Sequence, residues 1–591
     1  MLKERKDVAE RLKWNTSDIF ATEQEWETLF ANCETRLDFS EFEGKLGDAD
    51  TLLECFEKLN SLSADLSKLN VYAFMKHDED TRDSKYAALI SRTNSLGMKV
   101  ALNTAFINPE LSNLPTELLQ SFARDEKFSD YDYTLRLIIK EKPHVLDKNT
   151  EALLSQGAKV FGGYRQVFNM LDNADFPYPT ITVDGQKTSI SHGTYGVLLR
   201  SPDRSLRKKV FKKYYKAYMG LINTITAAYV GNVEKNVFLM RARHFDSTLQ
   251  EALFGEDVDV KVYENLLESV NKSLPLLHRY FADRKKLMGY KELHMYDLHT
   301  PLVENAEIKV SYDEAFEIVK KGLAPLGAEY AELLQRAHDE GWIDVEETKG
   351  KRSGAYSISI WGLAHPYVLL NYQPTTSDVF TIAHELGHAM HSYFSECNQP
   401  QEKSGYRIFV AEVASTVNEI LLIKHLLANT DDQKLKKYLL SYYLDTLKST
   451  LFRQTQFAEF EYIAHDMAEK DIPLTKDALC EKYFELNKKY YGDAVISDDE
   501  IAYEWARIPH FYRAFYVYKY ATGIISAVSI AERILKEGEP AVADYFKFLS
   551  SGGSDSPVEL LKLAGVDLTK TDAFDSCMES FKSALEEFER L

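Results

Sequence analysis

Residues 378–394 read DVFTIAHELGHAMHSYF and contain the pattern H-E-x-x-H at His384, Glu385 and His388. In an α-helix, residues four positions apart lie on one face, so the two imidazoles can bind a single zinc ion. Glu385 follows the first histidine at about 100° around the helix axis, where its carboxylate can reach a water molecule on that ion. Two nitrogen ligands, an open coordination position and an adjacent base are what zinc-dependent hydrolysis requires. The motif therefore predicts a zinc hydrolase.

A small β-structure is predicted directly before this helix. Residues 355–360 and 367–372 have the composition of strands and are separated by a turn that contains glycine, histidine and proline. An exposed edge strand can pair with the backbone of an extended peptide, and small residues allow that backbone to come close. We therefore treat Gly354, Ala355 and Tyr356 as candidate substrate-binding residues, with a purely structural hairpin as the alternative.

A catalytic zinc ion needs a third protein ligand. The pattern H-E-x-x-H-x-x-G-x-x-H does not supply it, because His391 stands at the glycine position and Phe394 at the last histidine position. Glu396 lies about 12 Å beyond His388 along the same helix, which is too far for a shared ion. His391 is expected to pack beside the site rather than to bind metal.

Three carboxylates follow the motif helix. Glu402 lies in the polar loop NQPQEKSG, whereas Glu412 opens the apolar helix FVAEVASTVNEILLIKHLL, at 412 − 384 = 28 residues from the first histidine. Glu419 lies two turns further along the same helix. Because a buried carboxylate needs a partner, we predict that Glu412 binds the zinc ion and that Glu419 contacts a ligand histidine, with a surface position as the alternative for Glu419.

The segment 503–520 can supply hydrogen-bond donors to the oxyanion that peptide hydrolysis generates. It contains His510 directly after a proline, and it is rich in tyrosine. Helical periodicity predicts that Tyr512, Tyr516 and Tyr520 share a face and that Tyr518 points elsewhere. Most aromatic stripes belong to a core, so the residues alone leave the role of this segment open.

The motifs HELGHAMH and VAEVAST resemble those of the thimet oligopeptidase family of zinc metallopeptidases, and most closely its oligoendopeptidase F branch. The similarity covers nearly the whole chain and includes the segments 350–357, 505–523 and 548–567, which read GKRSGAYS, WARIPHFYRAFYVYKYATG and FLSSGGSDSPVELLKLAGVD. The resemblance implies a mainly α fold, a two-lobed helical ellipsoid with a deep substrate channel and a small β-sheet beside the motif helix. It also implies cleavage of oligopeptides rather than of folded proteins.

The resemblance also assigns roles to individual residues. It makes Glu385 the catalytic base, and it places a histidine and tyrosines over the substrate carbonyl. The histidine matches His510, and among the tyrosines we favour Tyr518, followed by Tyr516 and Tyr512. The ligands of one Zn²⁺ ion are implied to be His384, His388 and Glu412.

The rest of the chain is predicted to be largely helical. Residues 1–175 read mostly as helices, and further helices are expected from residue 201, over 258–289 and over 311–339. Residues 176–199 read as a small hairpin around Asp184-Gly185. We expect an N-terminal helical domain over 1–199 that ends in this hairpin, and a catalytic domain over 200–591.

Composition narrows the possible partners and the location. The chain has 591 residues and a formal net charge of −20, which argues against nucleic acid as a partner. The sequence has no apolar run of about 20 residues, so no membrane span is expected, and its charged start does not have the pattern of a signal peptide. The five cysteines are scattered and predict reduced thiols in the cytoplasm. The sequence leaves the oligomeric state open.

Together these features predict a cytoplasmic zinc endopeptidase that acts on short oligopeptides. A metallocarboxypeptidase or dipeptidyl carboxypeptidase on the same scaffold is the nearer alternative. A peptide-binding protein with an inactive site is the alternative from another functional class, and the intact motif residues argue against it.

Overall fold

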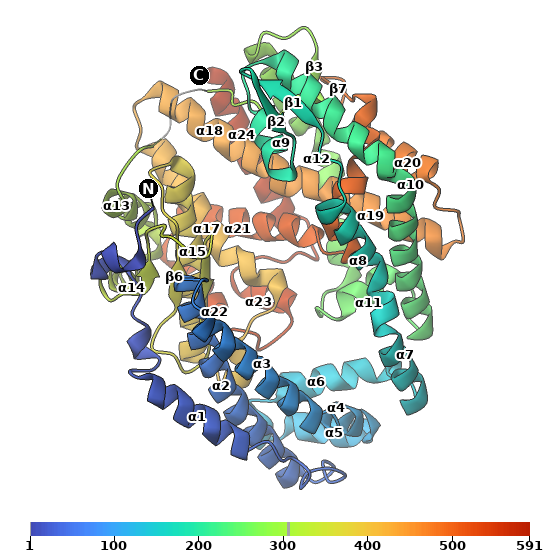
Figure 1. Cartoon of the computed structure of the whole chain (residues 1–591), viewed down its shortest axis with the longest axis vertical. Helices are drawn as coiled ribbons and strands as arrows, with labels where there is room; N and C mark the ends of the chain where they lie inside the picture. The colour runs from blue at the N-terminus through green and yellow to red at the C-terminus, as the bar shows by residue number, and fades with distance from the viewer. Residues whose placement is uncertain (1, 304–305, 307) are drawn as a thin grey trace. The chain divides into compact units, whose positions relative to one another are not determined.

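The computed structural model describes residues 2–303, 306 and 308–591, and these residues are mainly α-helical with three small sheets (Figure 1). The chain forms two compact units, each built from three segments. Unit 1 consists of Met1–Val145, Glu307–Ala428 and Ile530–Val566, and unit 2 consists of Leu146–Ala306, Asn429–Ser529 and Asp567–Leu591. The predicted mainly α class is confirmed. The predicted division of the sequence near residue 199 stays a prediction, and that residue lies inside unit 2.

Unit 1 contains most of the N-terminal helices and the motif helix. Its helices are α1 Glu23–Thr35, α2 Ala49–Glu79, α3 Ser84–Asn103, α4 Ile107–Asn113, α5 Thr116–Arg124, α6 Asp132–Glu141, α13 Tyr312–Gly322, α14 Ala328–Asp339, α15 Thr376–Asn398, α16 Gln401–Ser404, α17 Ile408–Ala428, α22 Glu539–Leu549 and α23 Pro557–Leu563. The helix α21, Tyr518–Glu537, begins in unit 2 and ends in unit 1.

Unit 2 is built around two long helices. Its helices are α7 Lys148–Phe161, α8 Gly163–Asn169, α9 His192–Leu199, α10 Arg204–Ala242, α11 Thr248–Phe254, α12 Val260–Leu287, α18 Gln433–Leu447, α19 Arg453–Glu469, α20 Lys476–Tyr491 and α24 Asp572–Arg590, and the short strands β3 Leu293–His294 and β7 Val495–Ile496 pair in parallel. The long helix α10 confirms the helix expected from residue 201, and it begins at Arg204 because the Asp203 side chain accepts hydrogen bonds from the backbone N–H groups of Ser205 and Leu206.

The small sheet of unit 1 has the order β4-β6-β5, with β4 Ile343–Asp344, β5 Tyr356–Ile358 and β6 Tyr367–Leu369. The antiparallel pairing of β5 with β6 confirms the predicted hairpin, although both strands are shorter than expected. The sequence did not reveal β4, which pairs in parallel with β6 and has too few residues to show strand periodicity. Since β5 is at the edge of the sheet, one side of its backbone is not paired with another strand.

One face of this sheet packs against the helical core of unit 1. Tyr367 and Leu369 of β6 belong to a buried cluster that also includes Trp26 of α1 and Leu69 of α2. Tyr356 of β5 is partly buried against the same cluster. Burial of these large apolar side chains stabilises the position of the sheet, at roughly 1.5–3 kcal/mol for each fully buried side chain. The sheet therefore holds β5 in a fixed position.

The predicted hairpin of unit 2 is present but ends earlier than expected. Strands β1 Thr180–Val183 and β2 Gln186–Ser189 are antiparallel. They are joined by Asp184 at φ 48° and Gly185 at φ 81°, which are values typical of a tight hairpin turn. Residues 192–199, predicted as part of the hairpin, form the helix α9 instead. The reason is local, because Ser191 and Thr194 form a capping box that starts the helix.

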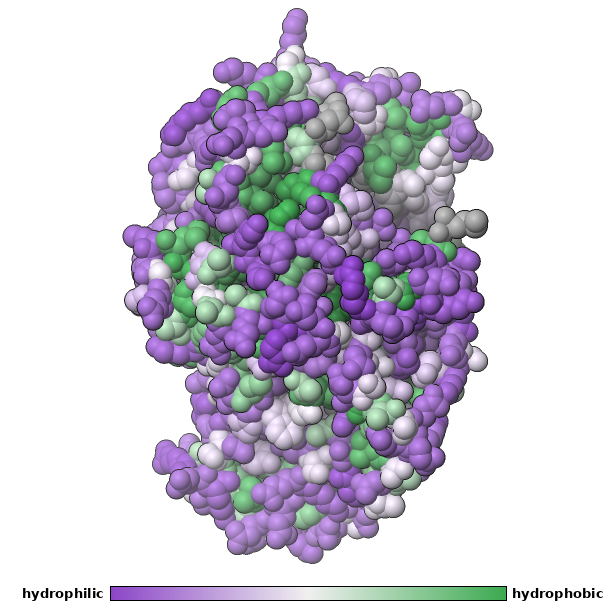
Figure 2. All heavy atoms as spheres, turned by 90° about the vertical axis from the view of Figure 1, so that its left-hand side faces the viewer, coloured by the Kyte–Doolittle hydropathy of each residue, from purple (hydrophilic) through white to green (hydrophobic). Residues whose placement is uncertain are grey.

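The length and hydropathy of the helices, and the hydropathy of the surface, bear on whether the chain could cross a membrane. None of the helices among the described residues is both long and apolar enough to cross a bilayer. The face drawn in Figure 2 is mostly hydrophilic, and its apolar residues lie in separate patches. None of the five cysteines, all of which are described, forms a disulfide, and four of them are buried.

Candidate active site

The helix α15 presents the H-E-x-x-H motif, and its start is fixed locally. The Thr375 side chain accepts a hydrogen bond from the backbone N–H of Asp378 at 3.2 Å, which satisfies one unpaired donor of the first turn. The apolar side chains around the motif, among them Ile382, Leu386 and Met390, are buried. The histidines therefore lie at the boundary between the core of unit 1 and its surface.

The helix α17 carries Glu412 and Glu419 and packs directly along α15 (Figure 1). The amide of the buried Asn418 donates to the carbonyl of Ala383 at 3.0 Å, and the Asn418 Oδ1 atom accepts from the hydroxyl of Tyr330 at 3.0 Å. A buried, fully engaged amide of this kind fixes the register of the two helices. That register brings two glutamates from one helix to the histidines of the other.

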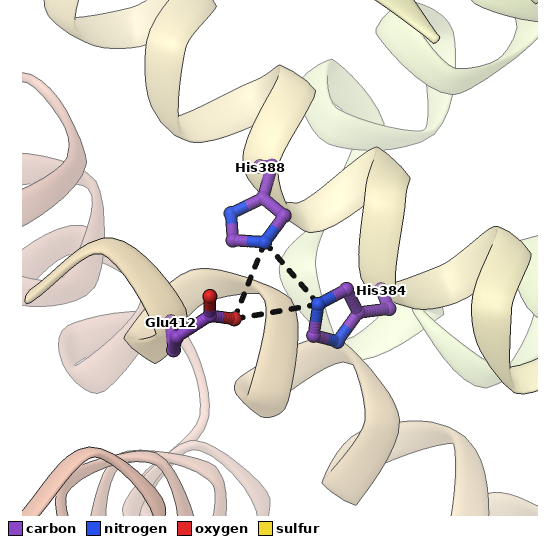
Figure 3. Close-up of side chains that lie close together, drawn as sticks. All are labelled: His384, His388 and Glu412. Atoms are coloured by element: carbon purple, nitrogen blue, oxygen red, sulfur yellow. Dashed lines mark hydrogen bonds and ion pairs between the residues drawn. The ribbon is translucent and has the colours of Figure 1, made fainter. Parts of the chain in front are cut away.

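Three side chains converge on one point, as Figure 3 shows. The Nε2 atoms of His384 and His388 are 3.2 Å apart, and each lies 3.3 Å from Oε2 of Glu412. Among the described residues, His384, His388 and Glu412 form the group whose ligand atoms lie close enough to hold a metal ion, all within 4.8 Å of one another. Two imidazole nitrogens and one carboxylate oxygen are a donor set that suits catalytic zinc.

Glu419 orients the first histidine. Its Oε1 atom lies 2.5 Å from Nδ1 of His384, so the ring donates its Nδ1–H to this carboxylate. The Nε2 atom then faces His388 and Glu412. A carboxylate bonded to the outer nitrogen of a ligand histidine fixes the tautomer and increases the basicity of the ring. The contact gives the partly exposed Glu419 a partner at the metal group.

The electrostatics of the group fit a bound cation. Burial lowers the pKa of His384, but hydrogen bonds to Glu412 and Glu419 outweigh it and raise that pKa to about 10. Burial raises the pKa of Glu412, whereas the two histidines lower it more strongly and hold it far below its ordinary value. Two carboxylates therefore compensate positive charge at this point, which is the charge balance that a divalent cation requires.

Glu385 is buried, with 7% of its surface exposed, and it lies next to the same charges. Burial raises the pKa of its carboxyl, and the positive charges of His384 and His388 oppose that shift without cancelling it. A carboxylate with a raised pKa next to the metal group is suited to accept and return a proton near neutral pH.

His391 is a packed residue and does not join the group. It is 1% exposed, and its ring stacks on Tyr406 with centroids 3.8 Å apart and an interplanar angle of 4°. Burial lowers the pKa of His391 to about 3, so the ring is neutral at pH 7. His391 was predicted to pack beside the site, and in the structure it packs α15 against Tyr406.

The candidate substrate residues lie at the start of β5. Gly354 is exposed and has φ +88°, a conformation that favours glycine, and a Cβ atom at this position would meet open space. Ala355 is partly exposed. The hydroxyl of Tyr356 donates to Oδ2 of Asp78 at 3.0 Å, and its ring packs against Phe74 with centroids 6.0 Å apart. Gly354 and Ala355 are thus accessible, whereas the Tyr356 side chain anchors the strand.

His510 and the tyrosines near it belong to unit 2. His510 is exposed, and its Nε2 atom lies 3.4 Å from the hydroxyl of Tyr520. The Tyr516 ring stacks beside it with centroids 5.9 Å apart. Burial, followed by the charge of Arg513, lowers the pKa of His510, so its ring is neutral at pH 7.

The predicted tyrosine face is wrong. Tyr512 ends a 3₁₀ helix, Phe515 has φ 50°, and α21 starts only at Tyr518, so no continuous helix joins Tyr512 to Tyr516. Tyr512 is 6% exposed and stacks on Phe168, while Tyr518 is 0% exposed. Tyr516 and Tyr520 are partly exposed around His510. Tyr520 was not among the predicted site residues, because its spacing of ten residues from His510 gives no signal of the contact.

The remaining site residue that sequence reasoning missed is Gly387. This glycine lies inside the motif, at the point where α15 approaches the backbone of Ser415 in α17. Gly387 occupies one of the two variable positions of H-E-x-x-H, so this motif does not indicate that a glycine is needed there.

Two family models match the chain. The model described as peptidase family M3 matches residues 197–580, and the model described as oligopeptidase F matches residues 110–178.

Individual relatives match over nearly the full length. Oligopeptidase PepF of Bacillus subtilis is 41% identical, over 100% of this chain and 88% of the relative. A solved structure from Chlamydophila abortus superposes with a TM-score of 0.95 at 33% identity and covers 100% of both chains. The crystal structure of oligoendopeptidase-F from Enterococcus faecium superposes with a TM-score of 0.74 at 34% identity, over 96% of this chain and 99% of that chain.

Proposed function

This chain belongs to peptidase family M3 and is a metallopeptidase, and on that basis we propose that it is a zinc-dependent endopeptidase that hydrolyses internal bonds of short oligopeptides. The observation that carries the proposal is the convergence of His384, His388 and Glu412 on one point, with Glu385 buried beside it. The names of the relatives, oligopeptidase and oligoendopeptidase, support oligopeptides as the substrate class.

The proposed metal is one Zn²⁺ ion bound by the two histidines and Glu412. Bound there, zinc would polarise the scissile carbonyl and lower the pKa of a water molecule. Glu419 holds the His384 ring in the orientation that directs Nε2 to the ion. Glu385 accepts the proton of the attacking water and then passes it to the leaving amine.

We assign His510 the role of a hydrogen-bond donor to the oxygen of the scissile carbonyl. Its exposed, neutral ring, the adjacent hydroxyl of Tyr520 and the neighbouring ring of Tyr516 support this assignment. A preorganised donor of this kind stabilises the negative charge that develops on that oxygen. Tyr516 and Tyr520 are the better tyrosine candidates, because Tyr518 and Tyr512 are buried in the core of unit 2.

We further propose that an extended substrate pairs with the open edge of β5, next to the accessible Gly354 and Ala355 that precede this strand. Backbone hydrogen bonds to an edge strand bind a peptide with little dependence on its sequence. This mode suits an enzyme that accepts many short peptides. It disfavours folded proteins, whose backbone groups are already paired.

The test is hydrolysis of a peptide whose N-terminus is acetylated and whose C-terminus is amidated, with products identified by mass spectrometry. We expect internal cleavage that a chelator abolishes and added Zn²⁺ restores. A metallocarboxypeptidase or dipeptidyl carboxypeptidase would require the free C-terminus and leave this peptide intact. A peptide-binding protein with an inactive site would bind the peptide without any products. The cytoplasmic location and the lack of a nucleic-acid partner stay predictions from composition.

A further inference from the structure

Unit 1 contains a cavity of about 670 Å³ beside the candidate metal group. Its walls come from α2, from β5 and the residues after it, and from α15 and α16. Ser392 and Glu396 of α15 line it, and they lie about one and two helical turns beyond His388. A cavity of this volume can hold a long amino-acid side chain together with water.

The cavity wall carries negative charge. Glu396 and Glu402 are among its described lining residues, and these residues include no lysine, arginine or histidine. The other polar groups in the wall are hydroxyls and amides, such as those of Asn60, Ser359 and Gln401. Two carboxylates in the wall of one cavity attract a cation and repel an anion.

Glu396 has a hydrogen-bond donor but no cationic partner. The hydroxyl of Ser359 donates to its Oε2 atom at 2.6 Å, and within the described parts of the chain no basic side chain forms an ion pair with it. Burial raises the pKa of this carboxyl to about 7, and the Ser359 hydrogen bond opposes that shift only in part. A cation in the cavity would stabilise the ionised carboxylate and offset most of the effect of burial on its pKa.

The cavity also adjoins the proposed path of the substrate. Ser357, Ile358 and Ser359 line it, and the first two of these belong to the edge strand β5. A peptide paired with the open edge of β5 would direct alternate side chains to the same side. Glu396 lies about 12 Å along α15 from His388. A lysine or arginine side chain of the substrate can reach it from a position within about two residues of the scissile bond.

We propose that this cavity is a specificity subsite that binds the lysine or arginine side chain of a substrate peptide, with Glu396 as its anionic partner. The inference rests on the proposed peptidase function, and it adds a substrate class to that function. Glu402 contributes to the negative potential of the cavity, although the hydroxyl of Thr134 already donates to its Oε1 atom at 2.7 Å. Glu396 is a residue for substrate selection and takes no part in the proton transfers of catalysis.

The test compares the kcat/KM of blocked peptides that differ at one position. In an acetylated and amidated series, Leu, Lys, Arg and Glu are placed in turn at each of three positions on either side of the cleaved bond. We expect the wild-type protein to prefer Lys and Arg over Leu at one position by about tenfold or more, and to disfavour Glu there. In Glu396→Gln this preference should fall to near unity, while cleavage of the Leu peptide stays within about twofold of wild type.

The matched control is Glu117→Gln, which makes the same charge change at an exposed position of α5. It should retain the full preference of the wild type for Lys and Arg. Peptides with a free N-terminus and Leu at the test position form a separate arm. A preference that follows the free N-terminus rather than the side chain would overturn the proposal, as would a Lys preference that survives Glu396→Gln.

Binding to the inactive variant Glu385→Gln distinguishes this proposal from the proposed function. Isothermal titration calorimetry should show tighter binding of the Lys peptide than of the Leu peptide, and the double variant Glu385→Gln/Glu396→Gln should bind both equally. If the wild type cleaves none of the peptides but this difference in binding persists, the peptidase function is wrong and the subsite stands. Equal binding of the two peptides to Glu385→Gln would overturn the subsite alone.

Discussion

Gly387 of α15 lies directly against the backbone of Ser415 in α17, so that a Cβ atom on Gly387 would be 2.5 Å from the Cα atom of Ser415. The same Cβ would also be 2.7 Å from the carbonyl oxygen of Ala414. Both contacts are with backbone, which cannot rotate away as a side chain can. The absence of a side chain at Gly387 therefore allows α17 to bring Glu412 within 3.3 Å of both histidines.

Gly387→Ala is expected to separate α15 from α17 and to weaken metal binding. Overpacking of this kind costs roughly 1–3 kcal/mol of folding free energy, and the shift of Glu412 should lower zinc affinity at least tenfold. Urea denaturation and competition with a chromogenic chelator measure the two effects. Gly220→Ala is the control, because Gly220 lies in the helix α10 with open space around it and should gain slightly in stability. Wild-type zinc affinity in Gly387→Ala would contradict this account of the site.

Glu385→Gln is expected to lower kcat by about 10²–10⁴-fold while the protein keeps one zinc ion per chain. Glutamine preserves the shape of the side chain but cannot accept the proton from water. Zinc content by atomic emission and turnover of the blocked peptide are measured on the same sample. Turnover near the wild-type level would remove Glu385 from the mechanism, and loss of zinc would show that the residue supports the metal instead.

Glu419→Ala is expected to weaken zinc binding by about 10–100-fold, because the His384 ring loses the carboxylate that orients it. Glu419→Gln retains an acceptor for the Nδ1–H group and should recover part of the affinity. Equilibrium competition against a chelator gives both constants, and activity at saturating zinc should return in both variants. An unchanged zinc affinity in Glu419→Ala would mean that packing alone orients His384.

His510→Ala is expected to lower kcat by about 10²–10³-fold with a smaller change in KM, since its hydrogen bond is made mainly in the transition state. Phenylalanine at Tyr516 or Tyr520 should lower kcat less. Tyr518→Phe should affect thermal stability rather than kcat, because this side chain is 0% exposed. Steady-state kinetics with the blocked peptide measure these effects. If Tyr518→Phe were the one tyrosine variant to lose kcat, Tyr518 would again be the favoured tyrosine, as in the sequence analysis above.

Glu504→Gln is expected to destabilise unit 2 by about 3–5 kcal/mol at pH 7, because it leaves two guanidinium groups without their buried partner. Glu504 is 2% exposed and lies 2.7 Å from Arg453 and 3.1 Å from Arg507. Burial raises the pKa of Glu504, but the two arginines outweigh it and lower that pKa to about 2. Glu481→Gln on the exposed face of α20 is the control and should leave stability unchanged.

The pH dependence of this effect follows from the lowered pKa. The ionised Glu504 stabilises the fold fully above its unfolded pKa of about 4.3, and this stabilisation is lost as the pH falls from there towards the folded value. The difference in unfolding free energy between wild type and Glu504→Gln should thus be constant from pH 7 to about 5.5 and decrease below about pH 5. Urea denaturation at several pH values gives the difference. If the difference in unfolding free energy stayed constant down to pH 4, the ion pairs of Glu504 with Arg453 and Arg507 would not be the cause of the destabilisation.

The sequence by itself determined the features that depend on local spacing. Four-residue spacing placed His384 and His388 on one face of a helix, and periodicity predicted the long helix that begins shortly after residue 201. The proposal of Glu412 as the third ligand came from chemistry, because a carboxylate that opens an apolar helix requires a partner. The structure places its carboxylate beside both histidines, since periodicity and burial of charge act over a few residues or on one side chain.

Only the tertiary structure decided how residues far apart in the sequence meet. The contact of Glu419 with His384 across 35 residues depends on the register of α15 and α17, which Asn418 and Gly387 fix through packing. The tyrosine face failed for a related reason, because the positive φ of Phe515 interrupts the helix that periodicity assumed. The cavity around Glu396 is formed by three separate segments of the chain, so its negative charge had no signature in any one of them.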